Sequence, residues 1–180
     1  MKILIVYATT DGQTRKIARF AADRLCDAGH NVELVTAAET EGLDLSRFDA
    51  AVLAGSIHAG HFQDNLQSFA KASAEALGRL PTLFLSVSLS AAGTDEKDWE
   101  GIRAVVTEFQ KATGWTPGRV EHVAGAFRFT QYDFFKSWAM RWIAHQKKQE
   151  VDPERDTEYT DWEKLAVVLA DWVPFRVKAA

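Results

Sequence analysis

The sequence is poor in the residues and patterns on which several protein classes depend. It contains a single cysteine, Cys26, among 180 residues, which excludes an internal disulfide and a cysteine-based metal cluster. It has no apolar run of the ~18 residues that a membrane-spanning helix needs. Its formal net charge of −4 gives no support to a nucleic-acid partner, which would favour a basic surface.

The rest of the composition is typical of one globular domain. Hydrophobic residues make up 47% and charged residues 26%, so we expect a single domain over residues 1–180 with a three-layer core. The chain enters an apolar run at once, without the basic leader of a signal peptide, and we expect a cytoplasmic protein. Cys26 is expected to be a small apolar filler on the flank of the first helix, with a reactive thiol as the alternative.

The first informative stretch joins an apolar run over residues 3–8 to a helical pattern that begins at residue 13. This predicts a buried strand, a turn and a helix N-terminus, whose free N–H groups and dipole favour an anion. An ordinary turn capped by Thr or Asp is the alternative. The residues that we expect to hold a phosphate here are Thr9, Thr10, Asp11, Gly12, Gln13 and Thr14.

The motif lacks the Gly-Lys-Ser/Thr of a P-loop and the glycines of a dinucleotide fingerprint. Hydroxyls and amides without a lysine suit the monophosphate of flavin mononucleotide (FMN) better than a triphosphate with magnesium. The stretch resembles the phosphate loop of flavodoxin-like proteins, with Asp11 where a hydroxyl residue usually stands. A carboxylate beside a dianion is unfavourable unless it turns away to cap a backbone amide.

Strand and helix patterns alternate along the chain. Strands are expected over residues 3–8, 32–36, 50–55, 82–88 and 120–126, and helices over residues 13–28, 65–77, 97–112 and 162–175. Apolar strands that alternate with helices predict a parallel sheet covered on both faces. The expected fold is α/β: a flavodoxin-like, doubly wound, five-stranded sheet of order 2-1-3-4-5 in a three-layer sandwich.

Small and polar residues follow three of these strands, after Ala8, Gly55 and Ser88. The loops should gather at one edge of the sheet, and the flavin ring is expected between the second and the third. The expected ring contacts are Ser56, Ile57, His58, Gly60, Ser88, Leu89, Ser90, Ala91 and Gly93.

The alternative for His58 and His61 is a pair of exposed loop histidines, and no third ligand is spaced for zinc. The second loop offers an apolar or imidazole face to stack on. Apart from Phe62, neither ring loop supplies the Trp and Tyr pair that usually encloses the ring in flavodoxins. One face of the ring should therefore be open to a second planar molecule.

A segment of about thirty residues, 127–158, exceeds the minimal fold and is expected to be an aromatic and basic helical insertion after the fifth strand. Residues 128–148 carry five basic residues and one acid, a net charge of +4, which leaves −8 for the remainder. Such a helix can cover a planar anionic ligand or lie in a bilayer interface. The alternative is a helix that packs its aromatic face on the domain.

Several short motifs together resemble one flavodoxin-like family, the menaquinone-dependent protoporphyrinogen IX dehydrogenases of haem biosynthesis. The motifs are Thr-x-Asp-Gly-Gln-Thr at 9–14, Gly-Ser-Ile at 55–57 with Gly-His at 60–61, Ser-Val-Ser-Leu at 86–89, Gly-Ala-Phe-Arg at 125–128 and Tyr-Thr-Asp-Trp-Glu at 159–163. Asp11 agrees with this family, and the likeness runs from Met1 to about Val173.

The resemblance implies an FMN enzyme that oxidises protoporphyrinogen IX to protoporphyrin IX and passes the electrons to menaquinone or a similar respiratory quinone. The flavin would carry the redox chemistry, so no catalytic side chain and no metal are expected. The substrate residues that we expect, with two arginines for the propionates, are Arg128, Phe129, Tyr132, Trp138 and Arg141. A peripheral contact of residues 128–148 with the cytoplasmic membrane face is also expected. The alternatives are a flavodoxin-type electron carrier and a nicotinamide-fed, FMN-dependent quinone reductase.

Overall fold

A five-stranded parallel sheet forms the centre of the molecule. The computed structural model describes residues 1–127 and 157–173. The strand order is β2-β1-β3-β4-β5 and every pairing within this sheet is parallel, which confirms the predicted order 2-1-3-4-5. The strands of the sheet are β1 (Lys2–Ala8), β2 (Asn31–Thr36), β3 (Ala50–Ser56), β4 (Thr82–Ser88) and β5 (Arg119–Ala124).

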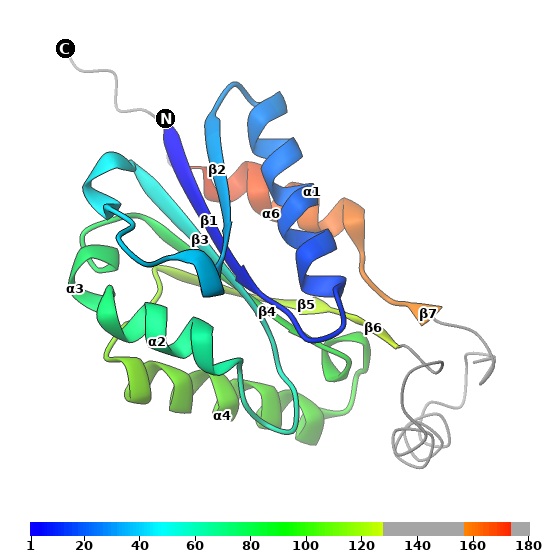
Figure 1. Ribbon diagram of the computed structural model, residues 1–180. Helices are drawn as coiled ribbons and strands as arrows, with labels where there is room; N and C mark the ends of the chain where they lie inside the picture. Colours follow the sequence, from blue (N-terminus) through cyan, green and yellow to red (C-terminus); the bar gives the residue numbers. More distant parts are fainter. Residues whose placement is uncertain (128–156, 174–180) are drawn as a thin grey trace.

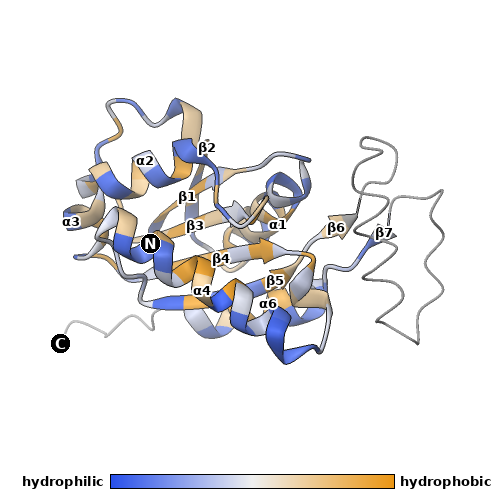
Figure 2. Ribbon diagram, turned by 90° about the horizontal axis from the view of Figure 1, so that it is seen from below, coloured by the Kyte–Doolittle hydropathy of each residue, from blue (hydrophilic) through white to orange (hydrophobic). Residues whose placement is uncertain are grey.

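Helices cover both faces of the sheet and complete the predicted three layers (Figure 1). One face carries α1 (Gln13–Asp27) and α6 (Trp162–Trp172), and the other carries α2 (Asp64–Ala72), α3 (Ala74–Leu77) and α4 (Glu96–Thr113). Short 3₁₀ turns connect them at η1 (Ala37–Glu39), η2 (Leu45–Arg47) and η3 (Ser90–Ala92). The helices are polar on their outer sides, whereas the central strands are mostly apolar (Figure 2).

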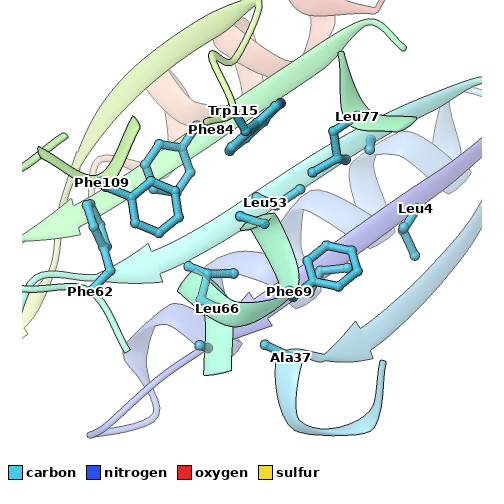
Figure 3. Close-up of a cluster of buried hydrophobic side chains, with 14 of the residues drawn as sticks. Leu4, Ala37, Leu53, Phe62, Leu66, Phe69, Leu77, Phe84, Phe109 and Trp115 are labelled. Atoms are coloured by element: carbon cyan, nitrogen blue, oxygen red, sulfur yellow. The ribbon is translucent and has the colours of Figure 1, made fainter. Parts of the chain in front are cut away.

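Two apolar clusters hold the layers together, one on each face of the sheet. On the α2–α4 face, rings of Phe62, Phe84, Phe109 and Trp115 pack with centroid distances of 5.0–6.5 Å (Figure 3). Each buried aromatic removes a large apolar area from water. On the α1–α6 face, smaller aliphatic residues fill the layer. The helical spacing predicts an inward face of Ile17, Ala18, Ala21, Leu25 and Ala28. The first four are buried, whereas Ala28 is the exposed C-cap of α1.

Two predicted elements differ from the observed ones. The helix expected over residues 65–77 is divided at Ser73, whose φ of −104° and ψ of 6° interrupt regular helix geometry; serine competes for backbone hydrogen bonds and is a weak helix former. The fifth strand ends at Ala124, not 126. Gly125 turns the chain out of the sheet, and its N–H donates to Ser88 O at 3.0 Å.

Beyond Gly125 the chain forms a second, two-stranded sheet. Strand β6 (Ala126–Phe127) pairs antiparallel with β7 (Thr157–Glu158), which precedes α6. We call this pair the stem. It lies at the same end of the molecule as the turn between β1 and α1 (Figure 1). The two ends of the chain between residues 127 and 157 therefore leave the domain next to each other.

The expectation for Cys26 was wrong, because this residue is exposed near the end of α1. Leu25 takes the inward position there, with 1% of its surface exposed. The next residue of a helix is rotated by about 100°, away from the core. In the part of the chain that the structure describes, no helix combines the length and the hydropathy that crossing a bilayer requires.

Candidate functional site

The turn between β1 and α1 leaves the helix N-terminus free for an anion. Gly12 is the N-cap with a φ of 87°, and no side chain of the described residues caps the helix. The first helical hydrogen bond runs from Lys16 N–H to Gly12 O at 3.2 Å, so the preceding first-turn N–H groups are available to a ligand. Within the turn, Thr9 Oγ1 accepts the N–H of Gly12 at 2.9 Å.

Thr14 adds a hydroxyl to this first turn. Its side chain is 1% exposed, and its Oγ1 has no hydrogen-bond partner within residues 1–127 and 157–173. A buried hydroxyl without a partner is costly, which favours a ligand that accepts from it. Backbone N–H groups with a hydroxyl donor fit a phosphate. The capping role considered for Asp11 is not observed, because the accepting side chain in the turn is Thr9.

Gln63 joins the first loop to the second, and sequence reasoning missed it. Its Nε2 donates to Ser56 Oγ at 2.6 Å and to Thr10 Oγ1 at 3.1 Å. The only sequence signal for Gln63 is a polar residue between a buried aromatic, Phe62, and the start of α2. The contact places the ends of β1 and β3 at one site.

The second loop closes in a tight turn over His58–His61. The two histidines exchange backbone hydrogen bonds, from His58 N–H to His61 O at 2.8 Å and from His61 N–H to His58 O at 3.1 Å. Both central residues have positive φ, 50° at Ala59 and 82° at Gly60, as in a type I′ turn. All four residues are exposed, so this turn can lie against a ligand.

The third loop follows β4 and is held from two sides. Ser88 Oγ accepts the N–H of Ala91 at 3.2 Å, and Trp99 Nε1 of α4 donates to Gly93 O at 2.9 Å. Ile57 N–H donates to Val87 O at 2.8 Å, which connects the second loop to the strand that carries the third. The three loops therefore lie at adjacent strand ends, as predicted from the fold.

Phe62, which follows the second loop, belongs to the apolar core and not to the loop surface. Phe62 is 4% exposed and lies 5.0 Å from the ring centroids of both Phe84 and Phe109. The apolar core beneath the loop takes up its side chain. The second loop is left with an exposed turn that carries two histidines and no Phe, Tyr or Trp side chain.

A polar pair lies under the third loop. Ser86 and His122 are opposite each other in the register of β4 and β5, and Ser86 Oγ and His122 Nδ1 are buried without a hydrogen-bond partner among the described residues. The His122 ring meets Trp99 edge to face at 5.6 Å. Burial lowers the pKa of His122, Arg103 and Lys164 lower it further, and Glu121 opposes them.

The stem contacts the first turn of α1. Lys16 Nζ lies 2.5 Å from Glu158 Oε2, and Trp162 Nε1 donates to Glu158 Oε1 at 2.7 Å. Burial alone would raise the pKa of Glu158, but hydrogen bonds from Lys16, Trp162 and Gln13 outweigh it and the pKa lies below its usual value. The cofactor end of α1 and the base of the additional segment are thus in direct contact.

The structure brings together the three predicted cofactor loops, which contain Thr9, Thr10, Asp11, Gly12, Gln13, Thr14, Ser56, Ile57, His58, Gly60, Ser88, Leu89, Ser90, Ala91 and Gly93. The predicted substrate residues lie outside the described part of the chain: Arg128, Phe129, Tyr132, Trp138 and Arg141. Within the described part, no group of three or more His, Cys, Asp or Glu side chains could hold a metal ion.

Comparison with known proteins identifies the family of this chain. A model of the flavodoxin domain matches residues 4–154, and this match indicates FMN as the cofactor. Two solved structures share the fold. A short-chain flavodoxin associated with a bacterial microcompartment is 19% identical, with 68% of this chain and 83% of that chain covered and a TM-score of 0.53. A mutant flavodoxin from Pseudomonas aeruginosa is 20% identical, with 81% and 96% covered and a TM-score of 0.51.

Curated relatives are more similar in sequence. The protoporphyrinogen IX dehydrogenase [quinone] of Escherichia coli (strain K12) is 32% identical over 92% of this chain and 91% of its own length. A protein of the same name from Leishmania major is 29% identical over 99% of this chain and 80% of its own length. The chain therefore belongs to the flavodoxin-domain family and, within it, to the quinone-dependent protoporphyrinogen IX dehydrogenases.

Proposed function

We propose that this protein oxidises protoporphyrinogen IX to protoporphyrin IX with bound FMN and passes the electrons to menaquinone or a similar respiratory quinone, as a step of haem biosynthesis. The observation that supports this most strongly is the 32% identity to the Escherichia coli dehydrogenase over nine-tenths of both chains. The oxidation removes six electrons in successive two-electron steps, and FMN when bound supplies this two-electron chemistry.

The chain's own residues would bind and orient the cofactor. The uncapped first turn of α1 and the Thr14 hydroxyl would hold the cofactor phosphate. Gln63 would keep the phosphate loop and the second loop at a fixed separation. The exposed turn at His58–His61 carries no Phe, Tyr or Trp to cover the isoalloxazine, which would leave one face open to a planar substrate.

The substrate's propionates call for cations, and residues 128–148 carry a net charge of +4. We propose Arg128 and Arg141 for the carboxylates, because a guanidinium pairs with them through two parallel hydrogen bonds. Phe129, Tyr132 and Trp138 would pack on the macrocycle. Replacement of both arginines by Gln should raise the KM for protoporphyrinogen IX and leave FMN affinity unchanged, with Lys111→Gln on α4 as the control. Unchanged kinetics would remove the two arginines from the proposal.

The decisive experiment is a comparison of turnover by the purified, FMN-loaded protein with two substrate pairs. Protoporphyrinogen IX with a menaquinone analogue should give protoporphyrin, measured by its fluorescence, at a rate far above that of NADPH with the same quinone. The reverse preference would identify a nicotinamide-fed quinone reductase. Turnover of neither pair, with FMN still bound, would leave a flavodoxin-type electron carrier and defeat the proposal.

Delivery of electrons to a membrane quinone also suggests that residues 128–148 contact the cytoplasmic face of the membrane. Basic and aromatic residues together favour an anionic bilayer interface. The protein should co-sediment with vesicles that contain anionic lipid, and a variant with Trp138 and Trp142 replaced by Ala should remain in the supernatant. Equal sedimentation of both forms would exclude these tryptophans as the membrane contact.

A further inference from the structure

Thr160 occupies a buried position between the first turn of α1 and the edge strand of the sheet. It is 8% exposed. Its Oγ1 accepts a hydrogen bond from Gln13 Nε2 at 2.9 Å and donates one to Ala124 O at 2.7 Å. The hydroxyl of Thr160 thus links Ala124, the last residue of β5, to Gln13, the first residue of α1. Gln13 and Thr160 are 147 residues apart in the sequence.

Gln13 is the residue through which this contact reaches the phosphate turn. It follows the N-cap Gly12 directly, and its side chain is 8% exposed. Its backbone N–H is one of the free first-turn donors, while its side-chain amide donates to Thr160 and also to Glu158. The Gln13 side chain therefore points away from the expected phosphate, and its contacts hold the first turn of α1 on the side opposite the phosphate.

The neighbouring ion pair does not perform the same task. Lys16 and Glu158 are close, but 59% of the Lys16 side chain and 32% of the Glu158 side chain are exposed, and exposed pairs contribute little. A buried hydrogen bond between neutral groups holds its geometry better, because water does not replace it. Gln13–Thr160 is therefore the contact that sets the position of the first turn.

We propose that Thr160 is a positioning residue for the cofactor phosphate. It does not touch FMN. By fixing Gln13 against the end of β5, it directs the N–H groups of the first turn of α1 at the phosphate. Coupling of this kind is reciprocal, so phosphate binding must also stabilise the segment that contains Thr160. The inference concerns the cofactor alone and does not depend on the identity of the substrate.

The test compares FMN with riboflavin, which has the same ring and no phosphate. Both are titrated in phosphate-free buffer, by quenching of flavin fluorescence, against wild type, Thr160→Val and Thr160→Ser. Thr160→Val removes both hydrogen bonds of the hydroxyl. Through the one to Gln13, it should raise the Kd of FMN about threefold to tenfold and change that of riboflavin less than about twofold. Thr160→Ser should restore FMN binding. Equal weakening of both ligands, or no weakening, would overturn the proposal.

Hydrogen exchange gives a readout that does not depend on affinity. Tyr159 N–H donates to Gly125 O at 3.0 Å, next to Thr160. Hydrogen exchange at the Tyr159 N–H should slow when FMN binds to wild type. Riboflavin, bound at equal saturation, should slow this exchange much less. Identical protection by both ligands would contradict the coupling.

Should Thr160→Val fail to fold, Gln13→Met removes the donor to Thr160, together with the contact to Glu158, and leaves the bond from Thr160 to Ala124 in place. The same selective loss of FMN over riboflavin is then expected, and its absence would contradict the proposal.

Discussion

At the scale of single residues, Thr14 has an energetic conflict that a ligand would resolve. Its hydroxyl is buried in the first turn of α1 and unpaired among the described residues. Leaving a buried hydroxyl unpaired costs on the order of 1–3 kcal/mol, whereas hydrogen bonds to a charged partner are worth roughly 1.5–3 kcal/mol. The same atom therefore destabilises the free protein and strengthens the complex.

Thr14→Val should separate these two effects, because valine keeps the shape and removes the hydroxyl. We expect FMN binding to weaken by about tenfold or more and the cofactor-free protein to become equally or more stable in urea unfolding. Thr14→Ser is the control and should bind like wild type. A stability loss in cofactor-free Thr14→Val would mean that the hydroxyl has a partner in the free protein.

A second residue-scale prediction concerns the turn at His58–His61. Gly60 has a φ of 82° and open space around its Cα, so the cost of a side chain there is conformational and not steric. Gly60→Ala should lower the free energy of unfolding by about 1–2 kcal/mol. Gly101→Ala, in the exposed and open interior of α4, should raise it by roughly 0.5–1 kcal/mol. The same sign for both in urea unfolding would contradict the assigned backbone conformation.

At the scale of elements, the loops depend on contacts between strand ends. Gln63 contributes two hydrogen bonds between the first and second loops. Gln63→Met should therefore lower the free energy of unfolding by about 1–2 kcal/mol and weaken the binding of FMN. Gln67→Met, one turn later on α2, is the matched control, because no side-chain hydrogen bond of Gln67 occurs in the described chain. Equal effects of the two variants in unfolding and FMN titration would refute the role of Gln63.

The sequence allowed the order and type of the main elements to be predicted, because apolar strands and amphipathic helices reflect burial that is local in sequence. The first turn of α1 was predictable because the apolar strand and the start of the helical pattern lie next to each other in the sequence. Cys26 was misplaced because one residue of helix phase separates the buried from the exposed side. The end of β5 was placed two residues late, because the strand continues only as far as its partner β4, whose last residue Ser88 pairs with Ala124.

The contacts that connect the loops could not be read from the sequence. Gln63 meets Thr10 across 53 residues, and Thr160 meets Gln13 across 147. The sequence around a glutamine or threonine does not distinguish a side chain that is exposed to water from one that forms a hydrogen bond with a distant part of the chain. Asp161 is a partial exception, because an aspartate before an amphipathic helix indicates an N-cap, and its Oδ1 does accept from Lys164 N–H at 2.9 Å.

At the scale of the whole molecule, stability should respond to acid through His122. Burial lowers the pKa of its imidazole in the folded protein, while the unfolded chain takes up the proton near pH 6.5. The unfolded state therefore binds more protons as pH falls from about 7 through 6.5 and below, and this destabilises the folded state.

This acid sensitivity can be measured by urea unfolding at pH 7.5 and 5.5. Wild type should lose more stability over this interval than His122→Asn, which cannot titrate there. His61→Asn, a change at an exposed loop position, is the control for the substitution itself and should keep the wild-type difference. Parallel losses in wild type and His122→Asn would show that other groups cause the acid sensitivity.

The antiparallel stem has a consequence for changes in chain length. Ala126 lies opposite Glu158 and Phe127 opposite Thr157, so the chain leaves and re-enters the domain at a single point next to the first turn of α1. Doubling the length of a flexible connection costs only about 0.6 kcal/mol. A change in the length of the chain between β6 and β7 should therefore leave the five-stranded sheet and its three loops intact.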